Sequence, residues 1–257
     1  MTRRHVALAL CLASSTLADA QQGRGASGFE WTKRMAAGST ITIRNGDGFI
    51  HVDESPSDRV EVRATRVSGS RATLSNALFD VNESSSGATI CTLYNGQRSC
   101  GERTRSNRGT SVRVGYTVLV PRDIRVNVST GKGEITVERV GSAVTASTGN
   151  GRVYVATERG PVNVSSGSGD IDVRVQSLPA DADVTAVTGN GLIRVAVPPE
   201  LNGDIDAHSE NGTFRTVRHQ SVPHFFRVVR NSAISPIVRV GLHAARMTTP
   251  SSRLIVG

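Results

Sequence analysis

The sequence predicts an all-β fold, a single-stranded β-solenoid of the parallel β-helix kind with short Gly-x-Gly turns. Three observations predict it. A segment in which apolar and polar residues alternate on both sides of Gly-x-Gly occurs four times between residues 126 and 195, and a weaker fifth copy covers 205–216. The copies begin 18, 18, 22 and 21 residues apart. β-Branched residues dominate them, and no long window has the spacing of an amphipathic helix.

Each copy predicts two short strands that meet at a glycine pair. In residues 144–155, Val144 and Ala146 alternate with polar residues, which is the pattern of a half-buried strand. Gly149 and Gly151 then permit a bend with positive φ or a close backbone approach. So short a unit cannot bury its apolar face alone, whereas stacked units can. An antiparallel sandwich, in which Gly-x-Gly forms hairpin loops, is the alternative.

Stacked units would align equivalent apolar residues in two inward columns. One column is predicted to contain Val126, Val144, Val162, Val184 and Ile205, and the other Ile135, Val153, Ile171, Ile193 and Phe214. The glycines predicted to turn the chain are Gly46, Gly48, Gly131, Gly133, Gly149, Gly151, Gly167, Gly169, Gly189 and Gly191.

Residues 1–20 have the pattern of a secretory signal peptide. Arg3 and Arg4 precede an apolar run that is too short to span a bilayer as a mature helix, and Ala18-Asp-Ala20 fits a cleavage site. No second apolar run of membrane length follows. We therefore expect an exported chain, periplasmic, cell-surface or extracellular, without a transmembrane helix after cleavage. Residues 21–37 are expected to form an N-terminal linker.

The repeat domain is predicted to cover residues 38–216. Its first unit, residues 41–52, already has the apolar alternation and the glycine pair of the later copies. An insertion at about 68–111 then interrupts the repeat. Asn95-Gly96 at its centre is a strong signal for a two-residue hairpin turn.

Two cysteines flank this predicted turn. Folding about Asn95-Gly96 would pair Tyr94 with Gln97 and place Cys91 opposite Cys100, with Cα atoms about 4.5 Å apart. Facing cysteines in an exported chain should form a disulfide, so the insertion is predicted to be a disulfide-linked hairpin. A metal-binding or catalytic cysteine pair is the alternative, although Cys-x-x-Cys spacing and a nearby histidine are both missing.

The charge is strongly positive and concentrates at the C-terminal end. The formal net charge is +8, and the only lysines among the 30 basic residues are Lys33 and Lys132. Residues 217–257 form a basic, divergent tail with six arginines and no acidic residue. Such a tail could bind an anionic surface, cover the last unit, or have no selected role. Aromatic residues are scarce and are not interleaved with the arginines, so we expect no nucleic-acid partner.

Motifs for catalysis or cofactor binding are weak. Gly-x-Gly recurs before strands rather than before a helix, which excludes a dinucleotide site. Gly167-Ser-Gly-Asp170 resembles part of a calcium-binding repeat, but the other three strong copies lack the aspartate. No cofactor, metal or catalytic residue is predicted. The outward pairs Asp170 with Asp172 and Asp204 with Asp206 are candidate carboxylates of a glycan-cleaving site, or else solubilising positions.

Three further features belong together: the strand at 116–121, the Ser-Thr-Gly-x-Gly units at 129–137 and 147–155, and the Asn45-Gly-Asp-Gly start. With these features the chain resembles the putative adhesin family, a bacterial β-solenoid domain of unknown function. The resemblance covers about residues 38–216. It implies an exported, repetitive β-fold with no established catalytic residues. The chain departs from the family after residue 216, where another Gly-x-Gly unit is usual.

Three functions agree with these observations. The first is a non-enzymatic, adhesin-like scaffold that binds envelope polymers, glycans or other anionic surfaces. The second is a carbohydrate-active enzyme on a β-helix, and the third is a self-assembling structural module, because uncapped sheet edges pair readily. The oligomeric state does not follow from the sequence.

Overall fold

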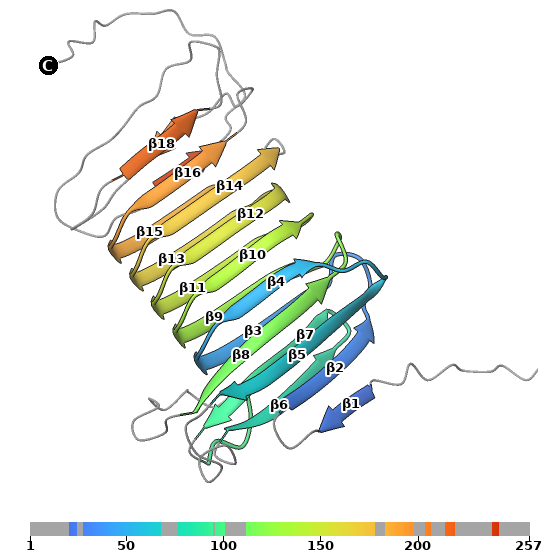
Figure 1. Ribbon diagram of the computed structural model, residues 1–257. Helices are drawn as coiled ribbons and strands as arrows, with labels where there is room; N and C mark the ends of the chain where they lie inside the picture. The colour runs from blue at the N-terminus through green and yellow to red at the C-terminus, as the bar shows by residue number, and fades with distance from the viewer. Residues whose placement is uncertain are drawn as a thin grey trace, which may run out of the picture.

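The computed structural model describes residues 21–24, 28–67, 77–94, 96–100, 112–177, 183–197, 204–206, 214–218 and 238–241. Within these ranges the chain is all-β, and none of it belongs to a helix that could cross a membrane. The strands form two open, mixed sheets, stacked from the N-terminal to the C-terminal units (Figure 1). Most of their buried apolar side chains form one core, and Cys91, Leu93 and Cys100 form a small separate cluster. The predicted signal peptide lies outside the described residues.

The two sheets are named here by their number of strands. The ten-stranded sheet has the order β1 (Gln21–Arg24), β2 (Gly28–Arg34), β5 (Arg59–Val67), β8 (Arg113–Val120), β4 (Ile50–Glu54), β10 (Ile135–Val140), β12 (Val153–Arg159), β14 (Ile171–Ser177), β16 (Ile193–Val197) and β18 (Phe214–Arg218). The nine-stranded sheet has the order β17 (Asp204–Asp206), β19 (Val238–Gly241), β15 (Val184–Asn190), β13 (Val162–Ser168), β11 (Val144–Asn150), β9 (Arg125–Lys132), β3 (Thr40–Asp47), β7 (Gly87–Tyr94) and β6 (Ala77–Ser84).

The repeat strands pair in parallel, and each unit contributes one strand to each sheet. β9, β11, β13 and β15 are neighbours in the nine-stranded sheet, and β10, β12, β14 and β16 are neighbours in the ten-stranded sheet. The glycine pair between the two strands of a unit therefore carries the chain from one sheet to the other. This parallel pairing excludes the sandwich alternative, in which Gly-x-Gly would join antiparallel neighbours.

The register aligns the two predicted apolar columns almost completely. Val126, Val144, Val162 and Val184 are successive partners in the nine-stranded sheet. Ile135, Val153, Ile171, Ile193 and Phe214 are successive partners in the ten-stranded sheet. The first unit also joins the columns, because Ile41 pairs with Val126 and Ile50 pairs with Ile135.

The fifth position of the first column differs from the prediction. Val240 of β19 is the partner of Val184, and Ile205 of β17 pairs with Val240 on its other side. Both pairings are antiparallel. A strand from the basic tail thus lies between the fourth and fifth copies. The sequence could not show this, because the tail lacks the glycine pair that marks the other units.

Antiparallel strands cover the N-terminal end of the parallel stack. β2 pairs with β5, and β5 pairs with β8, in the ten-stranded sheet, while β6 pairs with β7 in the nine-stranded sheet. Residues 21–37, expected to be a linker, instead contain β1 and β2. Trp31 of β2 is completely buried, because it alternates with polar neighbours along the strand and faces the core.

Contacts between the two sheets hold this N-terminal cap together. The rings of Phe29 and Phe79 stack with centroids 4.9 Å apart. The Trp31 indole N–H donates to Glu83 Oε1 at 2.9 Å, and Lys33 Nζ lies 2.6 Å from Glu83 Oε2. The hydrogen bond from Lys33 holds the pKa of the Glu83 carboxyl below its usual value.

The predicted disulfide between Cys91 and Cys100 is present, but the predicted hairpin around it is not. The two Cα atoms are 5.5 Å apart. The strand opposite β7 is β6, with Asp80 facing Cys91, and β3 occupies the other edge of β7. The Gln97 amide does donate to the Tyr94 carbonyl oxygen at 3.1 Å, as the predicted turn requires. Because both edges of β7 are taken, residues 98–100 do not continue as a strand beside it. The Cys100 amide instead donates to Asp80 Oδ2 at 2.9 Å. Asn95 lies outside the described residues.

The glycine pairs stack on one another along one edge of the molecule. Gly151 has φ of +156°, and a Cβ atom built there would lie 2.0 Å from the carbonyl oxygen of Gly133 in the preceding unit. At Gly149 the corresponding distance to the carbonyl oxygen of Gly131 is 2.6 Å. A side chain at either position would therefore collide with the backbone of its neighbour.

Candidate binding site on the outer face of the ten-stranded sheet

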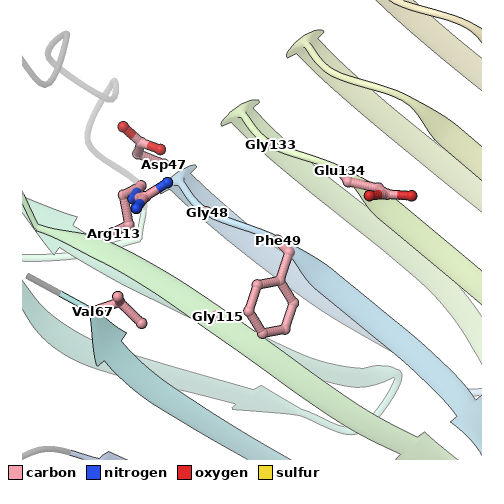
Figure 2. A pocket seen from close by; sticks show the side chains of 8 residues that line it. All are labelled: Asp47, Gly48, Phe49, Val67, Arg113, Gly115, Gly133 and Glu134. Carbon is pink, nitrogen blue, oxygen red and sulfur yellow. The ribbon is translucent and has the colours of Figure 1, made fainter.

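An open groove of about 310 Å³ lies on the outer face of the ten-stranded sheet, where the parallel stack meets the antiparallel cap. It crosses the beginnings of β10 and β4, then β8, and reaches the end of β5. Its lining residues are Asp47, Gly48, Phe49, Val67, Arg113, Gly115, Gly133 and Glu134 (Figure 2). The groove is next to the glycine-rich edge, so the repeat itself fixes its position.

Phe49 lies against the sheet because Gly115 leaves room for its ring. Phe49 follows the glycine pair of the first unit, where the later copies have Glu134, Arg152, Asp170 and Leu192. Gly115 faces outward on β8, and a Cβ atom there would lie 2.4 Å from two carbon atoms of the Phe49 ring. Figure 2 shows the ring beside Gly115. Any larger residue at position 115 would displace the ring.

The groove collects apolar side chains that remain open to solvent. Among the described residues, the large hydrophobic side chains that are clearly exposed are Phe49 at 49%, Val67 at 47% and Leu78 at 55%. Two of these three line the groove, on β5 and just before β4. Isolated exposed hydrophobic residues are ordinary, whereas neighbouring ones around a concavity favour a contact site.

Charged side chains border this apolar floor. Asp47 and Arg113 lie at one end of the groove, and Glu134 lies on the side of β10 (Figure 2). Both signs of charge are therefore available to a ligand that also covers the Phe49 ring. The arrangement can bind and orient a ligand, and it contains no nucleophile paired with a base.

A second group of polar side chains follows the groove along β4. His51 and Asp53 are the next outward positions after Phe49, and Glu138 is on the neighbouring strand β10. One ligand atom from each of the three residues lies within 4.8 Å of the others. Asp53 Oδ1 accepts the Glu54 amide at 2.7 Å, and Arg139 forms an ion pair with Asp53 Oδ2. All three residues are half-buried.

The carboxylates considered for a glycan-cleaving site do not come together. Asp172 is on β14 in the ten-stranded sheet, whereas Asp204 and Asp206 are on β17 in the nine-stranded sheet. Asp170 accepts the Leu192 amide at 2.8 Å, and so it supports a turn in the next unit. Asp172 is 6% exposed rather than solvated, with Arg174 Nε 3.3 Å from its Oδ1.

Sequence reasoning missed both the groove and the polar group beside it. One signal was present, because an aromatic residue at position 49 differs from the residues that follow the other glycine pairs. The sequence also indicates that Phe49, His51 and Asp53, as alternate residues of one strand, point to the same outer face. The positions of Gly115 and Glu138 next to them depend on strand pairing between distant segments, which the sequence alone did not reveal.

Comparison with known proteins finds structural similarity only. No protein-family model and no curated protein matches the sequence. A putative cell adhesion protein from Clostridium sporogenes has a similar structure, with 12% identity, coverage of 74% of this chain and 99% of that one, and a TM-score of 0.44. A putative adhesin from Parabacteroides merdae is 11% identical, covering 79% and 95%, with a TM-score of 0.33. A putative adhesin from Bacteroides fragilis is 9% identical, covering 79% and 97%, with a TM-score of 0.29.

Proposed function

We propose that this chain is a non-enzymatic, exported, adhesin-like protein that binds a glycan polymer of the cell envelope or of another surface. Its parallel units serve as a β-solenoid scaffold, and the Phe49 groove is the contact site. The observation that carries the proposal is the exposed aromatic ring in a groove with charged residues at its border. The disulfide agrees with an oxidising compartment outside the cytoplasm.

A glycan suits this groove because a sugar ring has an apolar face and a polar edge. The apolar face can cover Phe49 and Val67, as aromatic side chains bury large areas at little entropic cost. The hydroxyl groups can then bond with Asp47, Glu134 and Arg113. The groove is open rather than enclosed, which suits one segment of a long polymer better than a small molecule that must be surrounded.

The test is binding of the purified chain to isolated envelope polysaccharide and peptidoglycan, with Phe49→Ala beside Leu78→Ala. Leu78 is as exposed as Phe49 but lies on β6 of the nine-stranded sheet and does not line the groove. If Phe49 is the central aromatic residue of the contact, its truncation should cost about 2 kcal/mol, so we expect about a thirtyfold loss for Phe49→Ala. Leu78→Ala should bind like the unmodified chain.

Two outcomes contradict the proposal in different ways. If the unmodified chain binds none of these polymers, the adhesin-like function is wrong. If it binds and Phe49→Ala binds equally well, the function stands but the groove is not its site.

A further inference from the structure

We infer that His51, Asp53 and Glu138 form a binding site for a divalent transition-metal ion, for which Zn²⁺ is the best fit. The three side chains project from two adjacent parallel strands on the outer face of the ten-stranded sheet. Their donor atoms converge to within 4.8 Å of one another. The inference goes beyond glycan binding and does not depend on it.

Strand register brings the three donors together. Thr136 is the partner of His51 and Val137 is the partner of Val52, so Glu138 follows at the level of Asp53. Residues 51 and 53 share one face of β4 because side chains alternate along a strand. The site therefore rests on paired strands rather than on a loop, which gives its donors fixed positions.

The bonds around Asp53 hold its carboxylate in place and leave it able to bind a metal. Asp53 Oδ1 accepts the amide of Glu54, and Arg139 contacts Oδ2. Each carboxylate oxygen has a further lone pair, so neither contact blocks a metal ion. Outer partners of this kind commonly orient metal-binding carboxylates.

A bulge in β10 places Arg139 close enough to Asp53 to orient its carboxylate. The pairing of β10 with β12 shifts between Glu138 and Val140, and Arg139 has a positive φ of 54°. Arginine rarely adopts this conformation, and bulges redirect side chains at functional sites. Here the bulge turns the guanidinium toward Asp53, while Glu138 keeps its outward direction.

The remaining two donors have no other role in the described structure. Within the described ranges, neither the His51 imidazole nor the Glu138 carboxylate has a hydrogen-bond or ion-pair partner. Two carboxylates this close repel each other, and Arg139 contacts only Asp53 of the two. A cation between the three donors relieves that repulsion.

The donor set decides which cation fits. Imidazole nitrogen and carboxylate oxygen are both Zn²⁺ ligands, and three protein donors leave the fourth position of a tetrahedral site for water. Ca²⁺ requires six to eight oxygen donors, and Mg²⁺ requires an octahedral oxygen shell, so an imidazole disfavours both.

The test is isothermal titration calorimetry of the full chain with ZnCl2, for the unmodified protein, His51→Gln and Glu138→Gln. Glu158→Gln is the matched control, because Glu158 is an outward carboxylate on β12 of the same sheet and pairs with Arg122. We expect each substitution in the site to weaken Zn²⁺ binding at least about tenfold, and the control to leave it unchanged.

Co²⁺ gives a second readout, because its visible absorption reports the donor set. The absorption of the bound ion should be present in the control and lost in His51→Gln. Unfolding midpoints in EDTA should be the same for all variants. If His51→Gln does not fold, Glu138→Gln decides the question. Absence of Zn²⁺ binding to the unmodified chain would overturn the inference. So would unchanged affinity in the site variants, which would assign the ion to histidines elsewhere, such as those of the tail.

Discussion

The hydroxyl group of Thr148 donates a hydrogen bond to the carbonyl oxygen of Gly133, one unit earlier in the stack, at 3.1 Å. Thr148 is 5% exposed, so water cannot replace this bond. The same bond recurs in the other units, where Thr130 donates to Gly48, Ser166 to Gly151 and Thr188 to Gly169. The serine or threonine before the glycine pair in each of these four units therefore ties its turn to that of the preceding unit.

Replacing Thr148 by valine should destabilise the fold, because it leaves the buried carbonyl of Gly133 without this donor. We expect a loss of about 1–3 kcal/mol in the free energy of unfolding, measured by urea denaturation with an unchanged m value. Thr145→Val is the control on the same strand, since Thr145 faces solvent. An equal loss in both variants would contradict a special role for the buried hydroxyl.

Gly151→Ala and Gly38→Ala should differ strongly, although both glycines have positive φ. At Gly38, with φ of +78°, no atom lies within 4 Å of a new Cβ, so only backbone strain of about 1–2 kcal/mol is expected. At Gly151 the Cβ would also meet the Gly133 carbonyl oxygen, and we expect a loss above about 3 kcal/mol. Thermal unfolding of both variants measures the difference. Similar losses would show that close stacking of the turns is not essential.

Removing the disulfide with Cys91→Ser and Cys100→Ser together should lower stability by about 2.7 kcal/mol, from the entropy of closing a loop of ten residues. Urea unfolding with and without a reducing agent measures it. Reductant should destabilise the unmodified chain and leave the double variant unchanged. If reductant has no effect on the unmodified chain, the disulfide does not stabilise the fold.

Alkaline pH should unfold the protein through two buried tyrosines. Burial raises the pKa of Tyr94 to about 12 and also raises that of Tyr116. The unfolded chain releases phenol protons near pH 10, before the folded chain does. The free energy of unfolding should therefore be steady below about pH 10 and fall between about pH 10 and 12, by up to about 1.4 kcal/mol per pH unit for each tyrosine.

Tyr94→Phe should make this decline shallower, as measured by urea unfolding at a series of pH values. The variant also loses the hydrogen bond from the Tyr94 hydroxyl to Asn45 Oδ1. That loss lowers the free energy of unfolding by the same amount at every pH and does not change how steeply it falls with pH. A slope as steep as in the unmodified chain would show that Tyr94 does not contribute to the alkaline transition.

The parts that the sequence predicted are those that repeat. Val126, Val144 and Val162 are equally spaced in the sequence, so each valine can lie beside its equivalent in the next unit, and this arrangement makes the strands pair in parallel and in register. The cap was missed although Phe29 and Trp31 alternate with polar residues, because that strand has no glycine pair and was interpreted as linker. β19 and the neighbours of Phe49 depend on contacts between distant segments, and no local pattern encodes these.

The most direct test of the in-register parallel stack is the electron paramagnetic resonance spectrum of spin labels on cysteines placed at Thr145 and Asn163. These two exposed residues are partners on adjacent strands β11 and β13. The strands should be about 4.8 Å apart, so the doubly labelled protein should show strong spin–spin broadening relative to the two singly labelled proteins. A spectrum equal to the sum of the single-label spectra would contradict the in-register parallel stacking of the units, on which this account of the fold depends.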